Sequence, residues 1–146
     1  MIAMKASEIA SVVQGTLHGE DVTVTQAAVI NSAEATPGSL FLAIKGERVD
    51  GHDFVADAQS HGAVLTLSTK EVAGPHIIVS DVVVALGKLA QHVRSNLLNL
   101  IVVGITGSQG KTTTKELLAA VLSAEGPTIA PKGNNNNELG VPITLL

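Results

Sequence analysis

The feature that most constrains this chain is a glycine-rich turn between an apolar segment and a helical pattern. The turn reads Thr106-Gly107-Ser108-Gln109-Gly110-Lys111-Thr112 and follows the apolar segment 100–105. A strand, a glycine-rich turn and a helix that begins near Lys-Thr are typical of a phosphate-binding P-loop. Glycine lets the backbone fold closely around phosphate oxygens with its N–H groups pointing inward. The turn therefore predicts a phosphate site.

Two side chains in the turn suit phosphate chemistry. Lys111 supplies a positive charge beside a helix N-terminus, which itself attracts anions, and the Thr112 hydroxyl can ligate Mg²⁺. One position departs from the usual pattern, because Ile105 stands where the first glycine is expected and Gly104 comes one residue earlier. The alternative interpretation is an ordinary turn between a strand and a helix.

Composition narrows the class of protein. The 146 residues are 45% hydrophobic and 15% charged, which fits a soluble α/β protein, and the net charge of −4 argues against a nucleic-acid partner. The absence of cysteine suits a reducing cytoplasm. No signal peptide and no membrane-spanning segment are expected, so we predict a cytoplasmic location without membrane insertion. The five histidines show no ligand spacing, and the sequence does not favour a metal centre built from them.

The hydrophobic pattern predicts an alternation of helices and strands. Helices are expected over 6–14, over 53–61 with Asp53 as its cap, over 81–97 with Asp81 as its cap, over 112–124 and from Val141. Strands are expected over 22–30, 40–44, 63–67, 76–79, 100–105 and 128–130. This order predicts a small N-terminal α/β domain, residues 1–97, followed by the first part of a P-loop ATPase domain with a parallel sheet, residues 98–146.

The second part is too short for a complete domain of that kind. A parallel sheet is covered on both faces, and residues 98–146 supply two strands at most. After Lys111 there is also no strand that ends in an acidic residue for a Mg²⁺ site. We therefore expect an incomplete piece that is inactive alone. Its apolar strand 100–105 should self-associate or pack poorly, with ATP binding at ~1 mM or weaker.

Longer stretches resemble the Mur ligases of peptidoglycan synthesis. Residues 104–116 resemble the ATP loop of this family, and 133–146 resemble the branch that adds D-alanyl-D-alanine. Upstream, 37–43 and 45–54 resemble the family's substrate domain. The resemblance implies an ATP-dependent amide ligase. Such an enzyme activates the carboxylate of UDP-N-acetylmuramoyl tripeptide as an acyl phosphate, which the amine of D-alanyl-D-alanine then attacks.

The resemblance also implies roles for individual residues. Lys111 and Thr112 would be catalytic, with Lys111 on the β- and γ-phosphates of ATP and Thr112 on Mg²⁺. The residues expected to bind ATP are Thr106, Gly107, Ser108, Gln109, Gly110, Lys111, Thr112 and Thr113. Those expected to bind the UDP-muramoyl substrate are Ser32, Lys45, Gly46, Asp50, His52, Asn134 and Asn137. The complete enzyme is expected to be a monomer that acts on small molecules.

Several alternatives stay open at this point. The family usually has Asp-Ser-Arg where this chain has Asn31-Ser32-Ala33, so a guanidinium group that would contact the nucleotide is missing. Asp50-Gly51-His52 is either a substrate contact or a local turn, and the asparagines at 134–137 are either a functional or a plain polar loop. The whole chain is alternatively a non-catalytic nucleotide-sugar or phosphate-binding module. It also resembles the meso-diaminopimelate-adding and folylpolyglutamate ligases, though the asparagine loop argues against these.

Overall fold

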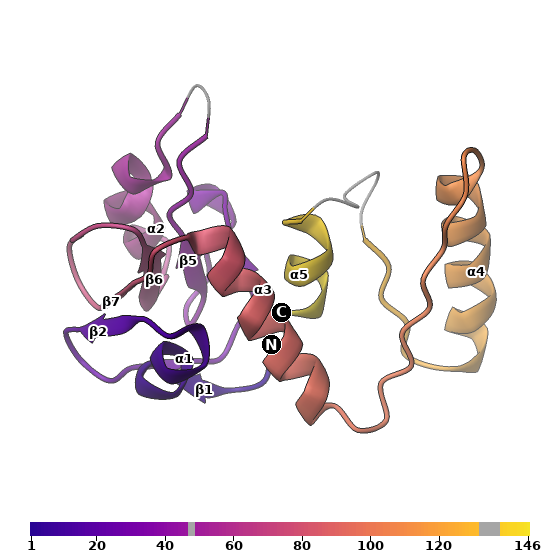
Figure 1. Cartoon of the computed structure of the whole chain (residues 1–146), viewed down its shortest axis with the longest axis horizontal. Helices are drawn as coiled ribbons and strands as arrows, with labels where there is room; N and C mark the ends of the chain where they lie inside the picture. Colours follow the sequence, from indigo (N-terminus) through magenta and orange to yellow (C-terminus); the bar gives the residue numbers. More distant parts are fainter. Residues whose placement is uncertain (47–48, 132–137) are drawn as a thin grey trace.

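A five-stranded sheet with helices on both faces forms the body of the molecule (Figure 1). The computed structural model describes residues 1–46, 49–131 and 138–146. The spatial order of the strands is β2 (Thr16–His18), β7 (His76–Ile78), β6 (Leu65–Ser68), β5 (Leu40–Leu42) and β4 (Ala28–Val29). Strands β4, β5, β6 and β7 run parallel to one another, whereas the edge strand β2 pairs antiparallel with β7. The α/β class predicted from the sequence is confirmed.

The expected strand over 22–30 is divided between two sheets. Strand β3 (Thr23–Val24) pairs with β1 (Met4–Lys5) in a separate two-stranded sheet, and β4 joins the large sheet beside β5. Between them the backbone N–H groups of Thr25 and Gln26 both donate to the carbonyl oxygen of Gly38, at 3.0 and 3.1 Å. These two hydrogen bonds lie where the chain leaves the sheet of β1 and β3 and enters the five-stranded sheet.

Helices connect and cover the strands. Their bounds are α1 (Ala6–Val13), the 3₁₀ helices η1 (Ser32–Glu34) and η2 (Gly51–Phe54), α2 (Val55–Ser60), α3 (Val82–Asn96), α4 (Lys111–Glu125) and α5 (Gly140–Leu145). The Asp81 cap is confirmed, because its carboxylate accepts from the N–H groups of Val83 and Val84. The prediction that Asp53 caps the next helix is wrong. Asp50 caps the 3₁₀ helix η2 instead, and α2 follows η2 directly.

The core lies on both faces of β5. Leu40 and Leu42 point into a cluster that α1 and α3 cover, while Phe41 points into a second cluster with Val55 and Ala58 of α2. Alternation along the strand explains this division, because successive side chains point to opposite faces. All three strand residues are fully buried. This two-sided burial is the arrangement expected of a parallel sheet.

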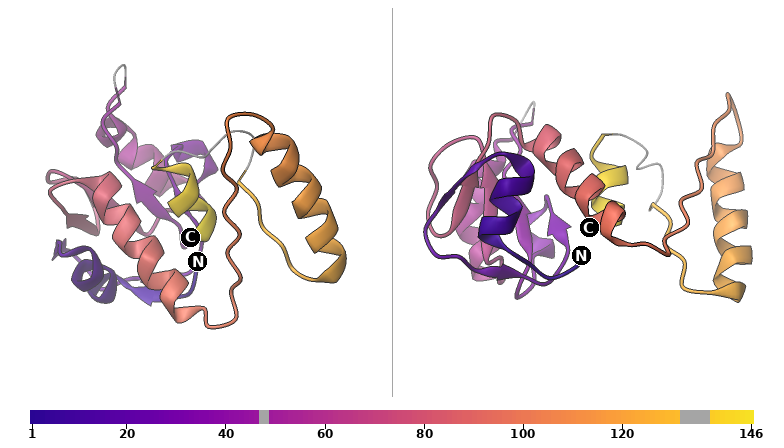
Figure 2. Two further views of the ribbon diagram at one scale, coloured as in Figure 1. Left: turned by 45° about the vertical axis from the view of Figure 1, so that its right-hand side comes forward. Right: turned by 60° about the horizontal axis from the view of Figure 1, so that its bottom comes forward.

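The C-terminal part departs from the sequence expectation. Residues 100–105 and 128–130 form no strand among the described residues, so both predicted strands are wrong. A strand requires a neighbour to pair its backbone N–H and C=O groups, and none of the described strands lies beside these segments. Ile101 is accordingly 86% exposed. Helix α4 has no buried residue and lies apart from the layered body in every view (Figures 1 and 2).

The chain then returns to the body through α5. This helix packs against α3 (Figure 1). The side chain of Leu146 joins the core cluster of α1 and α3. The two termini lie near one another in the views of Figures 1 and 2. Among the described helices, none combines the length and the apolar character needed to cross a bilayer.

We propose that residues 1–97 form a domain that folds alone. Apart from Leu146, every buried residue of both core clusters precedes residue 97. The isolated segment 1–97 should therefore unfold cooperatively in urea, with coincident transitions by circular dichroism and by amide NMR signals. Residues 1–146 are the matched control. Non-coincident or absent transitions in the segment 1–97 alone would contradict this boundary and make α5 an obligatory part of the domain.

Candidate functional site

The glycine-rich turn ends at the first residue of α4. Gly110 has φ +75° and is the residue immediately before the helix, and Gly107 has φ +154°. Both values lie in the region that favours glycine. A side chain at Gly110 would meet no atom within 4 Å, so the backbone conformation and not crowding requires glycine there. The turn brings the backbone of residues 107–110 next to the N-terminus of a long helix.

Lys111 lies over this turn. Its Nζ atom donates a hydrogen bond to the carbonyl oxygen of Gly107, four residues earlier in the chain. The helix begins at the same residue, and the N–H group of Thr114 makes a helical bond to Gly110 at 2.9 Å. Within the described part of the chain no side chain caps this end of α4. The lysine charge and the helix N-terminus therefore lie at one place, as a phosphate site requires.

The other predicted residues of the turn lie at the surface. Thr106, Ser108, Gln109, Thr112 and Thr113 are exposed, so their hydroxyl and amide groups are accessible from solvent. Thr112 directly follows Lys111 in the first turn of the helix, where a hydroxyl suits a hard cation such as Mg²⁺. The predicted substrate residues Asn134 and Asn137 lie outside the described residues.

The remaining predicted substrate residues gather at one edge of the sheet. Ser32 follows β4, and Lys45, Gly46 and Asp50 follow β5, so all lie beyond the carboxyl ends of parallel strands. Lys45 and Asp50 pair across a short antiparallel bridge, and the N–H group of Gly46 donates to Val49 at 2.9 Å. The carboxyl edge is where open α/β sheets bind ligands. Lys45 and Gly46 are exposed there, whereas Ser32 is buried in η1.

Asp50 and His52 make contacts within the protein. The carboxylate of Asp50 accepts from the backbone N–H of His52 at 3.0 Å and from the Nδ1 atom of its ring. The Nε2 atom of the same ring faces the N–H group of Thr69 at 3.4 Å. The hydroxyl of Thr69 also lies 3.3 Å from this nitrogen. These contacts hold Asp50-Gly51-His52 in a local turn, and the side chain of His52 is 4% exposed.

The sequence analysis missed Lys70 at this edge. Its Nζ atom lies 3.3 Å from the Oδ2 atom of Asp50, and its side chain is 56% exposed. Lys70 follows β6 in the same way as Lys45 follows β5, so two lysines lie at the carboxyl ends of neighbouring parallel strands. The signal in the sequence was a lysine shortly after a buried strand. Its contact with Asp50 depends on which strand lies beside β6, and the sequence alone does not show that.

Asp50 makes the stability of this edge depend on pH. The backbone N–H of His52, then its ring, and Lys70 hold the pKa of Asp50 well below its ordinary value. A lowered pKa in the folded state stabilises the fold above about pH 4, and this contribution is lost as the pH falls below that value. Asp50→Asn keeps an acceptor oxygen for the cap and removes the charge. We expect the wild type to be more stable than this variant at neutral pH.

The measurement is urea unfolding of both proteins at several pH values. The difference in free energy of unfolding should narrow as the pH falls below about 4, because the carboxyl group takes up a proton there in the unfolded chain while it stays ionised in the folded protein. If the difference between the two proteins stayed constant as the pH falls, the charge of Asp50 would contribute nothing to the free energy of unfolding.

Comparisons with known proteins show the relationship of this chain. Residues 26–98 match the model of the Mur ligase family, catalytic domain, and residues 105–146 match that of the Mur ligase middle domain. The chain is 43% identical over its whole length to UDP-N-acetylmuramoyl-tripeptide–D-alanyl-D-alanine ligase of Escherichia coli K12, and covers 32% of that protein. For the ligase of the same name from Mycobacterium tuberculosis H37Rv the identity is 38%, with 34% of that protein covered.

Solved structures give the same relationship. A crystal structure of MurF from Acinetobacter baumannii superposes with a TM-score of 0.87 at 35% identity, over 99% of this chain and 33% of that one. MurF from Thermotoga maritima, solved in complex with ADP, superposes with a TM-score of 0.72 at 38% identity, over 84% of this chain and 29% of that one. The chain thus spans about a third of the length of these relatives. It belongs to the Mur ligase family.

Proposed function

We propose that this chain supplies the phosphate-binding loop and part of the substrate site of an ATP-dependent amide ligase. The reaction joins D-alanyl-D-alanine to UDP-N-acetylmuramoyl tripeptide in the synthesis of the peptidoglycan precursor. The observation that carries the proposal is the turn 107–110 at the N-terminus of α4, with Lys111 lying over it. The names of the relatives and the ADP complex of the Thermotoga protein support this choice of reaction and nucleotide.

The proposed chemistry requires charge stabilisation at the phosphoryl group. A carboxylate oxygen of the tripeptide attacks the γ-phosphorus of ATP, ADP leaves, and an acyl phosphate forms. The amine of D-alanyl-D-alanine then attacks the acyl carbon, and phosphate leaves as the amide bond forms. Lys111 and the N–H groups at the start of α4 stabilise the negative charge on the transferring group. This role uses the position at the start of α4 where the helix N-terminus and the charge of Lys111 lie together.

Mg²⁺ fits the same place. The exposed Thr112 hydroxyl, one residue after Lys111, is a hard oxygen donor at the end of the turn and is the residue that would hold the ion. The ion, when bound, neutralises charge on the phosphates. Thr106, Ser108, Gln109 and Thr113 complete the proposed nucleotide contacts.

The carboxyl edge of the sheet is proposed to bind the UDP end of the substrate. Lys45 and Lys70 are exposed there, and their charges suit the diphosphate. Gly46 offers an exposed backbone beside Lys45, while Asp50 and His52 hold the supporting turn. Ala33 stands where the family usually has an arginine. It is exposed in η1, so this position presents no charged group to the solvent. The substrates are small molecules of the cytoplasm, where ATP and nucleotide-linked sugars are available.

A chimera tests the proposal. Residues 1–146 replace the matching first third of the Escherichia coli ligase, and formation of the amide product is measured with ATP, Mg²⁺ and both substrates. The chimera should turn over, and Lys111→Ala should lower kcat by about 100-fold or more, because it removes a stabilising charge from phosphoryl transfer. The stability of the chimera should be unchanged, since Lys111 belongs to neither core cluster.

The control variant is Lys5→Ala, which removes an exposed lysine of β1 and should leave turnover unchanged. A folded chimera without activity would contradict the proposed reaction and favour a non-catalytic binding module. Normal turnover in the Lys111→Ala variant would contradict the role of the turn.

A further inference from the structure

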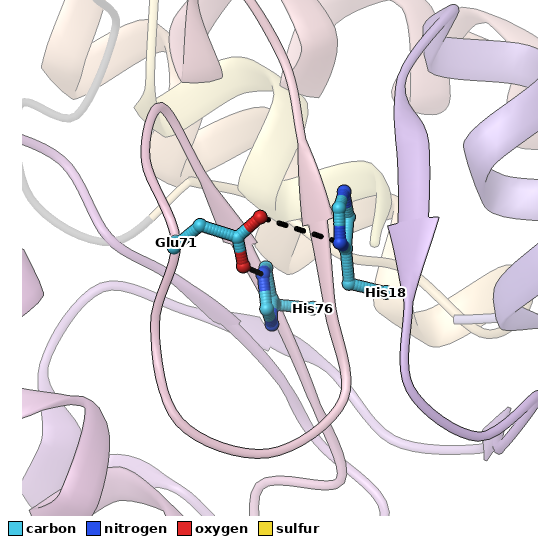
Figure 3. Close-up of side chains that lie close together, drawn as sticks. All are labelled: His18, Glu71 and His76. Atoms are coloured by element: carbon cyan, nitrogen blue, oxygen red, sulfur yellow. Dashed lines mark hydrogen bonds and ion pairs between the residues drawn. The ribbon is translucent and has the colours of Figure 1, made fainter.

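Three side chains from separate parts of the chain meet at the edge strand β2 (Figure 3). His18 of β2 lies directly opposite His76 of β7 in the antiparallel register. Glu71, in the segment that connects β6 to β7, points its carboxylate toward both rings (Figure 3). Directly opposite residues of an antiparallel pair have neighbouring side chains, so the register itself brings the two histidines together.

The ligand atoms of these side chains converge. Glu71 Oε1 lies 3.3 Å from His18 Nδ1, and Glu71 Oε2 lies 2.9 Å from His76 Nε2. One ligand atom from each residue falls within 4.8 Å of the other two. Atoms about 2.0–2.1 Å from a tetrahedral Zn²⁺ are about 3.3–3.4 Å apart, so the His18–Glu71 separation already fits such a site. The His18 ring is stacked on the His76 ring with their centroids 5.0 Å apart, so binding an ion requires the partly exposed side chains of His18 and Glu71 to rotate toward it.

His76 provides the argument for a cation. Its Nδ1 atom lies 2.8 Å from the carbonyl oxygen of Gly74, and its Nε2 atom lies 2.9 Å from Glu71 Oε2. Both ring nitrogens therefore face acceptors, whereas the ring of His52 faces one acceptor and one donor. A neutral imidazole has one N–H, and an ionised carboxylate only accepts. A metal ion held by His76 Nε2 and a Glu71 oxygen would satisfy both atoms and leave the ring proton on Nδ1 to be donated to the Gly74 carbonyl.

The protein holds this arrangement in place. Gly74 has φ +71° and packs against Gln59, whose Nε2 atom donates to the neighbouring carbonyl of Ala73 at 2.6 Å. The Gly74 carbonyl is thereby fixed toward His76, which is buried. A histidine that binds a metal usually donates its other N–H group to such a carbonyl, and this bond orients the ring.

We propose that His18, Glu71 and His76 bind a divalent transition-metal ion of the Zn²⁺ class. Two imidazole nitrogens and one carboxylate oxygen are a donor set that suits zinc, cobalt, nickel and copper. His18 adds a third donor atom, which a metal ion would use and a hydrogen bond between His76 and Glu71 does not need. The ion would join β2 to β7 and to the segment 69–75.

Metal titration of the 146-residue chain tests the proposal. The chain is freed of metal with a chelator and titrated with Co²⁺, and the visible absorption of the bound ion is recorded. We expect one Co²⁺ per chain, displaced by Zn²⁺, and a thermal unfolding midpoint that rises with Zn²⁺ concentration. His18→Ala and Glu71→Gln should each weaken binding by about tenfold or more and abolish the rise. Both replace exposed side chains, so folding is preserved.

The matched control is His61→Ala. His61 also lies beside a carboxylate, with its Nδ1 atom 3.7 Å from Asp57 Oδ1, and it is 45% exposed compared with 38% for His18. The one cluster of possible metal ligands found among the described residues does not include His61. The His61→Ala variant should therefore bind the metal as the wild type does. Equal losses in His61→Ala and His18→Ala would overturn the proposal. So would the absence of stoichiometric binding, which would leave the His76–Glu71 contact as a plain hydrogen bond.

Discussion

The burial of β5 on both of its faces is the constraint on which the rest of the layered body depends. Leu40 and Leu42 require a covering layer on one side, and Phe41 requires another on the opposite side. Helices α1 and α3 supply the first layer and α2 supplies the second. Because the crossover through α2 makes β6 parallel to β5, the carboxyl ends of these strands lie at the same edge. The lysines that follow them are therefore neighbours.

The sequence predicted the parts of the fold whose signals are local. The buried strands near 40–44, 63–67 and 76–79 were correct, and so were the helices that became α1, α3 and α4. Strands β1 and β2 were missed because each is very short and pairs with a segment distant in the sequence. The strand expected over 100–105 failed for a related reason. Its apolar residues have the composition of a buried strand, but no described partner pairs with their backbone groups.

The same division applies to the candidate sites. The positive φ angles of Gly107 and Gly110 and the position of Lys111 at the start of α4 could be predicted, because the turn is one continuous segment. The contacts of Lys70 with Asp50 and of Glu71 with His18 and His76 were not, since they join residues from different strands and loops. Histidine spacing along the chain does not favour a metal centre. The antiparallel register of β2 and β7 places two of these histidines together all the same.

The chain therefore combines a layered body, which holds the edge with Lys45 and Lys70, with a glycine-rich turn at the start of the exposed helix α4. Amide NMR of residues 1–146 during titration with ATP and Mg²⁺ tests the phosphate role of that turn most directly. The account predicts shifts that concentrate in residues 107–113 and grow up to ~1 mM ATP or beyond, with β5 and β6 unchanged. Shifts centred elsewhere, or no shifts in this segment at any concentration, would contradict it.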